Sequence, residues 1–384
     1  MLYLDYNGSA PLRKKVAQYL SERLEKEGPY ANPNANHFIG SKCLMQIEKT
    51  RKNVAKFLDC NPHQVIFNSG STEGISSVFL HTYFRHKDSD RKIILISDTE
   101  HAAPINESMF LENYGFKVVF IPTNPNGLLD FNFLENYVNE NSTNIALVCV
   151  MAANNETGVI QPYEKIGSLC KKFRVSYLCD TTQIIAKAEF SFEQSNSDFI
   201  TLSGHKIGAL PGVGALVVKN PESFIPVIQG GNQENGLRGG TQNYIGIETI
   251  NAAIDDILEN HGNYEQIARY RDKFESSLRA QFPDITIFGD NVKRICNTSF
   301  LSLPNTDASD IQDLLQLQKV FVTTSSACSD QNSRVSRVLS SMGISSELSS
   351  GAIRISFCSN NTKDDFEKAF QILKEIYFQI NKTY

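Results

Sequence analysis

The chain contains 384 residues, 41% of them hydrophobic and 21% charged, and its formal net charge is −5. This length predicts roughly two or three domains with a large apolar core, and the lack of a dense lysine and arginine stripe argues against nucleic-acid binding. The N-terminus has no signal-peptide pattern, and no segment stays apolar for about 18 residues. We expect a cytoplasmic globular protein that binds neither membranes nor nucleic acid.

Eight cysteines are scattered along the chain without a CxxC pair or a cysteine and histidine cluster. This pattern predicts neither a zinc site nor a disulfide framework. Cys149, Cys170 and Cys179 stand among apolar neighbours, as buried free cysteines usually do. Cys328 differs, because the polar stretch from Thr323 to Ser333 should leave its sulfur accessible. Cys328 is therefore the candidate reactive thiol.

Strand-like apolar runs alternate with segments of helical period between residues 65 and 218. The runs cover residues 65–67, 93–97, 145–151, 175–179, 198–202 and 214–218. This alternation predicts an α/β fold with a mainly parallel central sheet flanked by helices. A glycine-rich turn separates the last two runs, so we expect the chain to reverse tightly there.

Strand runs become shorter in the last third of the chain, and helical periodicity predicts long helices near residues 264–282 and 366–380. We therefore predict a large domain over residues 13–258. A smaller α/β domain is expected over residues 259–384, with residues 1–12 joining it.

Polar side chains follow five of the strand runs. The clusters are Asn68 to Glu73, Thr99 to His101, Asn154 to Glu156, Asp180 to Gln183, and Ser203 to Lys206. An ordinary polar loop explains any one of them. Because parallel strands point the same way, the five together should converge on one crevice at the carboxyl edge of the sheet.

The residue types in this crevice match the needs of pyridoxal 5′-phosphate. The amine of Lys206 can bond to the cofactor aldehyde, and the carboxylate of Asp180 can keep the ring nitrogen protonated. The imidazole of His101 can stack on the ring, and residues 68–72 offer N–H groups and hydroxyls to the phosphate. Nucleotide binding is the poorer interpretation, because the stretch has no Walker lysine and no GxGxxG pattern.

Short motifs along nearly the whole chain carry a family resemblance. They are Leu4 to Tyr6, Asn32-Pro33, Ser69 to Glu73, Glu100-His101, Asn154 to Gly158, Asp180 to Gln183, Ser203 to Lys206, Gly236 to Thr241, Ser326 to Cys328, and Ile353 to Ser356. With these motifs in this order and spacing, the sequence resembles the pyridoxal-phosphate cysteine desulfurases. These enzymes have the fold-type I architecture of the class V aminotransferases.

The resemblance implies that L-cysteine is converted to L-alanine while its sulfur stays on an enzyme cysteine as a persulfide. Lys206 would hold the cofactor and move the α-proton, Cys328 would accept the sulfur, and His101 would act as acid or base for the substrate thiol. Arg354, assisted by Asn155, would bind the substrate carboxylate. The implied cofactor contacts are Ser71, Thr72, His101, Asn155, Asp180, Gln183, Ser203, His205 and Lys206, with Thr241 reaching the phosphate of the neighbouring subunit in a homodimer.

The resemblance also implies a sulfur-acceptor protein, serving iron–sulfur cluster assembly or the thiolation of transfer RNA or a cofactor, and it implies no metal site. One departure from the family pattern concerns the cysteine loop, because Ser325 stands where a glycine usually precedes the reactive cysteine by three residues. A serine there should stiffen the loop. We expect slower or more partner-dependent sulfur transfer.

Two alternative functions stay open at this point. The first is another enzyme of the same fold, such as a selenocysteine lyase or a class V aminotransferase. A transaminase needs no thiol, so Cys328 argues against it, but selenocysteine would suit the same site. The second is a non-catalytic protein that binds a partner through a degenerate site, which the intact set of candidate residues disfavours.

Overall fold

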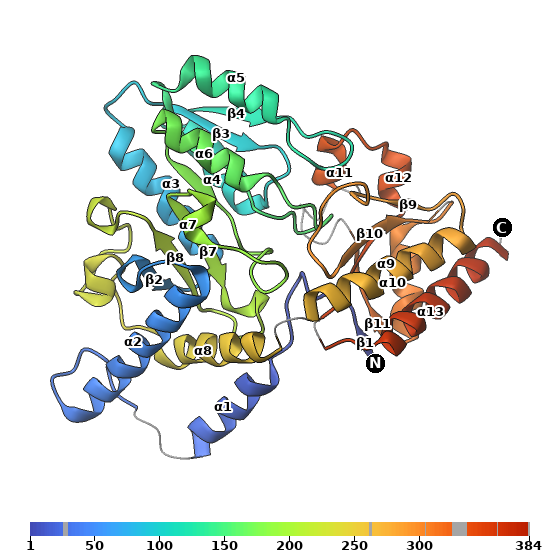
Figure 1. Ribbon diagram of the computed structural model, residues 1–384, viewed down its shortest axis with the longest axis horizontal. Coiled ribbons are helices and arrows are strands. Elements are labelled where there is room, and N and C mark those ends of the chain that lie inside the picture. The colour runs from blue at the N-terminus through green and yellow to red at the C-terminus, as the bar shows by residue number, and fades with distance from the viewer. Residues whose placement is uncertain (26–29, 261–262, 304, 325–335, 359, 383–384) are drawn as a thin grey trace.

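A seven-stranded sheet forms the centre of the larger part of the molecule (Figure 1), with strand order β2-β8-β7-β6-β5-β3-β4. β8 runs antiparallel to both of its neighbours, and the other pairings are parallel, so six strands share one direction. The strands are β2 (Val65–Asn68), β3 (Ile93–Ser97), β4 (Lys117–Ile121), β5 (Ile145–Cys149), β6 (Tyr177–Cys179), β7 (Phe199–Ser203) and β8 (Gly214–Val218). The predicted α/β sheet is confirmed, and so is the reversal after residue 202.

The computed structural model describes residues 1–384 except 26–29, 261–262, 304, 325–335, 359 and 383–384. Helices cover both faces of the large sheet (Figure 1). They are α1 (Lys14–Glu25), α2 (Phe38–Leu58), α3 (Ser71–His86), α4 (Ala102–Glu112), α5 (Phe131–Asn141), α6 (Tyr163–Phe173), α7 (Phe192–Ser195) and α8 (Tyr244–Glu259). None of the helices in these described ranges is long and apolar enough to cross a membrane.

Alternation along the buried strands divides the core of this part into two layers. In β3, Leu95 packs in the layer that contains α2, α6 and α8, whereas Ile94 and Ile96 pack in the layer that contains α3 and α4. Successive side chains of a strand point to opposite faces, so a strand buried on both faces must be apolar throughout. The apolar runs of the sequence are nearly continuous because these strands are buried on both faces.

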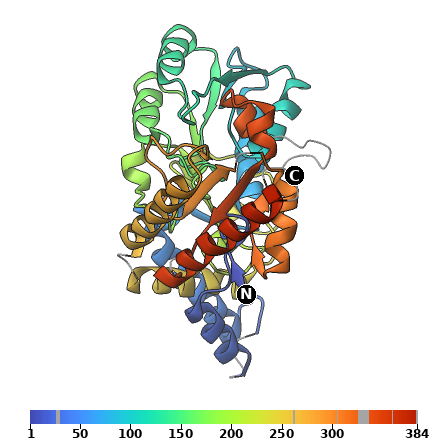
Figure 2. The same ribbon diagram turned by 90° about the vertical axis from the view of Figure 1, so that its right-hand side faces the viewer.

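A second, four-stranded antiparallel sheet with order β12-β13-β10-β9 lies in the smaller part of the molecule. Its strands are β9 (Thr286–Ile287), β10 (Thr298–Ser302), β12 (Thr323–Thr324) and β13 (Ala352–Ser356). The helices of this part are α9 (Asn263–Gln281), α10 (Ala308–Leu317), α11 (Arg337–Ser341), α12 (Ser346–Ser350) and α13 (Lys363–Lys382), and Figure 2 shows α9 and α13 side by side. These two helices correspond to the two that periodicity predicted.

The N-terminal segment joins the smaller part of the molecule. β1 (Leu2–Tyr3) pairs in parallel with β11 (Val320–Phe321), and Leu2 and Leu4 are buried in the same apolar cluster as α9 and α13. The chain then passes Asp5, which bridges to Ser356 of β13, before it reaches the large sheet. Residues 5–8 therefore lie where the two cores meet.

A buried ion pair ties α2 to the loop that follows the large sheet. Arg51 donates to both carboxylate oxygens of Glu234, at 2.7 and 3.0 Å, and Glu234 also accepts the backbone N–H of Phe67 at 2.9 Å. Both side chains are almost fully buried. Their mutual pairing offsets the cost of removing two charges from water, so neither charge can be removed alone without a large penalty.

We predict that Glu234→Ala lowers the free energy of unfolding by about 3 kcal/mol, because the buried Arg51 guanidinium loses its two-pronged partner and keeps only the half-exposed carboxylate of Glu48. Urea unfolding followed by circular dichroism measures this change. Glu367→Ala, which removes exposed ion pairs with Lys363 and Lys273, is the control and should change stability little. Equal stabilities of the two variants would contradict the prediction.

Candidate active site

A cavity of about 410 Å³ opens where the carboxyl ends of the parallel strands meet. Ten of the twelve residues predicted for the site line it: Ser71, Thr72, His101, Asn155, Asp180, Gln183, Ser203, His205, Lys206 and Arg354. Thr241 is not part of this lining. Cys328 and Ser325 fall within residues 325–335, outside the described residues. The expected convergence of the polar clusters is thus what the fold produces.

Lys206 stands in a single 3-10 turn, Gly204–Lys206, directly after β7. Its Nζ donates to the backbone carbonyls of Asn7 at 2.6 Å and Gly8 at 2.7 Å. The turn is tight because a Cβ on Gly204 would lie 2.9 Å from the carbonyl oxygens of both Leu210 and Val213. Only glycine fits at position 204, and this tight turn places Lys206 in the cavity wall.

Asp180 follows β6 and is held through one of its two oxygens. Oδ1 accepts the backbone N–H of Thr182 at 2.9 Å and the hydroxyl of Thr201 at 2.9 Å, and the Thr182 hydroxyl also bonds to it. Among the described residues, no hydrogen bond reaches Oδ2. Asp180 lines the cavity with that acceptor free for a protonated ring nitrogen.

The start of α3 forms the opposite wall. The N–H groups of the first helical turn have no helical acceptor, and Ser71 and Thr72 line the cavity beside them. The cap residue Gly70 has φ 146°, which residues other than glycine rarely adopt, and Gly214 of β8 packs against it. A Cβ on Gly214 would lie 2.6 Å from the Cα of Gly70. This close backbone contact leaves a cradle of donors suited to a phosphate group.

His101 is the N-cap residue of α4, and its Nδ1 accepts the backbone N–H of Ala103 at 3.1 Å. The ring proton of the neutral imidazole must therefore sit on Nε2. Desolvation by the surrounding protein lowers the pKa of His101, and the cations Lys206 and Arg337 act in the same direction against Asp180. His101 is a neutral ring with one N–H to donate.

Arg354 lies in the middle of β13, buried except toward the cavity. Its Nη1 donates to the carbonyl of Asn155 at 3.0 Å, and its Nη2 donates to Asp5 Oδ1 at 2.6 Å. Nε is buried and has no acceptor among the described residues. A buried arginine with one unused donor is ready to bind an additional anion.

The described residues on each side of 325–335 are anchored beside the cavity. Thr323 of β12 pairs with Arg354 in register, and Ser336 donates to Glu156 Oε2 at 2.6 Å. The Arg337 guanidinium donates to the backbone carbonyls of Asp98 and Glu100, immediately before His101. The described residues that flank this stretch thus contact Arg354 and the backbone just before His101, both of which belong to the site.

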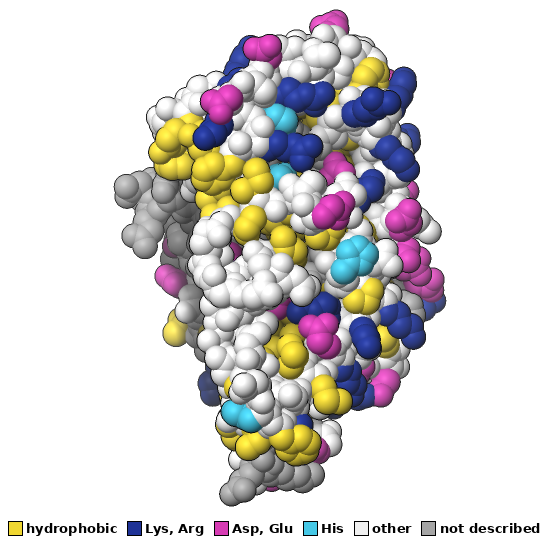
Figure 3. Space-filling model, turned by 90° about the vertical axis from the view of Figure 1, so that its left-hand side faces the viewer, with side chains coloured by type: hydrophobic (Ala, Val, Ile, Leu, Met, Phe, Trp, Pro, Cys, Tyr) yellow, Lys and Arg dark blue, Asp and Glu magenta, His cyan; other side chains and the backbone are white. Residues whose placement is uncertain are grey.

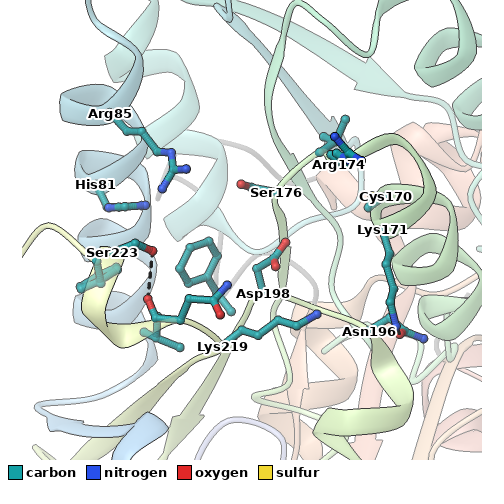
Figure 4. A pocket seen from close by; sticks show the side chains of 15 residues that line it. His81, Arg85, Cys170, Lys171, Arg174, Ser176, Asn196, Asp198, Lys219 and Ser223 are labelled. Carbon is teal, nitrogen blue, oxygen red and sulfur yellow. Dashed lines mark hydrogen bonds between the residues drawn. The ribbon is translucent and has the colours of Figure 1, made fainter.

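A second pocket, of about 270 Å³, lies at the opposite edge of the large sheet (Figure 4). None of the predicted site residues lines it. Asp198 stands at its centre, where burial raises the pKa of the carboxyl while a bond from the Tyr177 N–H and the nearby cations Lys219 and Arg85 lower it. Lys219 and Arg85 compensate the charge of the half-buried Asp198 carboxylate, and this accounts for their presence in the pocket.

Comparison with known proteins identifies the architecture. The sequence profile described as aminotransferase class V matches residues 2–368. The chain belongs to this family. Class V aminotransferases depend on pyridoxal 5′-phosphate, so the predicted cofactor is confirmed at the level of the family.

Individual class V relatives share most of the chain. The cysteine desulfurase IscS of Dictyoglomus turgidum is 30% identical over 376 residues, which is 98% of this chain and 94% of that protein. A solved NifS-like protein superposes with a TM-score of 0.89 at 30% identity, covering 98% of this chain and 99% of that one. The structure of SspA in complex with cysteine gives a TM-score of 0.81 at 25% identity over 94% of this chain and all of that one.

The cavity fits the class V cofactor. The N–H groups at the start of α3 would hold its phosphate, and the unbonded oxygen of Asp180 would accept a hydrogen bond from its ring nitrogen. Asn7 and Gly8 line the cavity although they belong to none of the predicted clusters, and Thr182 lies inside the cluster from Asp180 to Gln183 but had no predicted role of its own. Asn7 directly follows the Leu4 to Tyr6 motif, and this position was the only feature of the sequence that could have indicated its place in the site. Groups of three or more potential metal ligands do not occur among the described residues.

Glu100 supplies a pH-dependent prediction for this site. Its carboxyl is fully buried, and burial, followed by the Asp180 carboxylate, raises its pKa well above the ordinary value. Oε1 accepts the N–H of Met151 at 2.6 Å, and Oε2 has no partner among the described residues. The folded state thus binds a proton more tightly than the unfolded state, so the stability from this group is lost as the pH rises toward the folded-state pKa.

We predict that Glu100→Gln removes this dependence, so that the variant gains stability relative to the wild type as the pH rises from 5 to 8. The gain is at most about 1.4 kcal/mol per pH unit. Urea unfolding at each pH measures it, with exposed Glu135→Gln as the control. Parallel curves for wild type and Glu100→Gln would show that Glu100 is ionised in the folded protein.

Proposed function

We infer that this class V enzyme is a cysteine desulfurase, which takes sulfur from L-cysteine and releases L-alanine. The observation that carries this function is one cavity that brings together Lys206, Asp180, His101 and Arg354. Full-length relatives with about 30% identity are named cysteine desulfurases, which supports the same activity.

Lys206 and Asp180 are the residues that serve the cofactor. When bound, pyridoxal 5′-phosphate withdraws electrons from the substrate carbon that carries the amine. Asp180 would keep the ring nitrogen protonated through its free Oδ2, and the Thr182 and Thr201 donors hold that carboxylate in place. The Lys206 amine, held at the carbonyls of Asn7 and Gly8, is positioned to move the α-proton.

Arg354 and His101 act on the substrate. The buried guanidinium binds the carboxylate of L-cysteine, and Asp5 and the Asn155 carbonyl hold its plane. His101 faces the cavity with its proton on Nε2, so it donates a hydrogen bond to the substrate sulfur. Accepting the thiol proton at Nε2 would require His101 to give up its cap contact with Ala103.

Cys328 is the residue that we assign as sulfur acceptor. Its thiolate attacks the substrate sulfur, the bond from that sulfur to the β-carbon breaks, and the electron pair stays on carbon until a proton completes alanine. The persulfide sulfur then passes to an acceptor protein in the cytoplasm, for iron–sulfur cluster assembly or for thiolation of a cofactor or transfer RNA. The serine at position 325, where the family usually has a glycine, would make this last transfer slower or more dependent on the partner.

A homodimer completes the site in this proposal. Exposed apolar side chains gather at the start of α2, including Phe38, Ile39 and Met45, and Figure 3 shows hydrophobic side chains at this end of the molecule. Thr241 is exposed and lies outside the cavity of its own chain. The nearby Arg238 binds both oxygens of Glu73 at the start of α3 and so holds this loop against the site. Thr241 is thereby free to reach the phosphate of a second subunit.

We predict that Cys328→Ala abolishes alanine formation from L-cysteine under reducing conditions, because the sulfur loses its acceptor. Alanine and sulfide release are measured together, with Cys60→Ala as the control at a half-buried cysteine remote from the cavity. L-selenocysteine is the second substrate. Activity that survives the mutation, or that appears with selenocysteine alone, would transfer the assignment to selenocysteine lyase.

We predict that Arg354→Lys lowers kcat/KM for L-cysteine by about a hundredfold, because an ammonium group cannot make the two-pronged contact of a guanidinium. Steady-state kinetics measure the loss, and exposed Arg279→Lys should leave kcat/KM nearly unchanged. An unaltered KM for Arg354→Lys would exclude Arg354 from carboxylate binding.

A further inference from the structure

Lys187 is a buried lysine to which the proposed reaction assigns no role. It follows β6 and Gln183 in the chain, and 7% of its surface is exposed. No carboxylate of the described residues forms an ion pair with it. Burial drives the pKa of Lys187 well below its ordinary value, and the charge of Lys206 lowers it further. Burying an amine lowers the stability of the fold unless hydrogen bonds compensate for the lost contacts with water.

The Lys187 amine donates a hydrogen bond to a residue of the active site. Nζ donates to Oε1 of the Gln183 side chain. This contact fixes the direction of the amide, because the Nε2 end must then face away from Lys187. Nε2 donates to the backbone carbonyl of Asn7 at 3.0 Å, and the same carbonyl accepts Lys206 Nζ at 2.6 Å. Three hydrogen bonds thus connect the two lysines through one amide and one carbonyl.

The surroundings of Lys187 favour this contact over a general packing role. Its backbone already has partners, since its N–H donates to Ile184 at 3.0 Å and its carbonyl accepts the N–H of Cys296. Lys187 and Lys206 also line a common cavity of about 80 Å³, so their side chains border the same space. An apolar side chain would fill the same space without the cost of burying an amine.

We propose that Lys187 is a positioning residue that orients the Gln183 amide, and through it the Asn7 carbonyl that holds Lys206. The proposal rests on the proposed function in one respect, namely that Gln183 contacts the cofactor. Without Lys187, the amide can turn and present its oxygen to the Asn7 carbonyl, which would repel it. Cofactor binding and the placement of Lys206 would then both suffer.

A double-mutant cycle with cofactor affinity as its readout tests this coupling. The dissociation constant of pyridoxal 5′-phosphate is measured for wild type, Lys187→Met, Gln183→Ala and the double variant, starting from the cofactor-free proteins. We expect each single change to weaken binding about tenfold, the value of one hydrogen bond. The double variant should bind no more weakly than Gln183→Ala, because Lys187 then has no amide to orient.

Controls separate positioning from folding. Lys293→Met makes the same substitution at an exposed position and should leave cofactor affinity unchanged. The thermal midpoint of each cofactor-free variant shows whether it is folded, and Lys187→Gln, which also lacks the amine, replaces Lys187→Met if the latter does not fold. A purely structural lysine would lower the midpoint and leave the affinity of the folded protein unchanged.

The outcomes are distinct. Losses that multiply to about a hundredfold in the double variant, or an unchanged affinity for both Lys187 variants, overturn the positioning role while the desulfurase function stands. A wild-type protein that binds the cofactor but releases no alanine from L-cysteine overturns the function alone. Absence of cofactor binding by the wild type overturns both.

Discussion

Asn7 is the point on which the arrangement of the active site depends. Each polar atom of this residue takes part in a hydrogen bond, and the partners belong to both cores of the molecule. Its backbone carbonyl accepts Lys206 and Gln183 from the large part, and its other groups bond to Asn155, Asn297, Thr298 and Ser356. The relative placement of the two sheets therefore also sets the position of the active lysine.

The fold was largely predictable because its strands are buried on both faces and read as apolar runs. Lys206, Asp180 and His101 could be found because each directly follows such a run, and the shared strand direction brings strand ends together. β4 was not singled out, since it forms a sheet edge and its KVVFI sequence is partly exposed. The match over residues 2–368 confirms the family resemblance.

The remaining parts of the site could not be predicted because they depend on tertiary contacts. Asn7 resembles an ordinary polar turn residue until its partners, distant in sequence, are known. Thr182 stood inside a predicted cluster without a role of its own, Lys187 was not singled out, and no pattern in the serine-rich segment around Arg337 indicated a contact with the site. The role of Thr241 stays a prediction, because its proposed contact lies in a second subunit. The domain division at residue 258 is likewise a prediction.

The contact between Gly70 and Gly214 has a consequence for how this sequence can vary. Gly70 begins α3, Gly214 begins β8, and a side chain on Gly214 would enter the space occupied by both the Gly70 backbone and the Leu202 carbonyl. No compensating change of a neighbouring side chain can relieve this overlap, since the obstructing atoms belong to the main chain. A descendant of this chain that abandoned the chemistry of the cavity would still have to keep glycine at both positions in order to keep this fold.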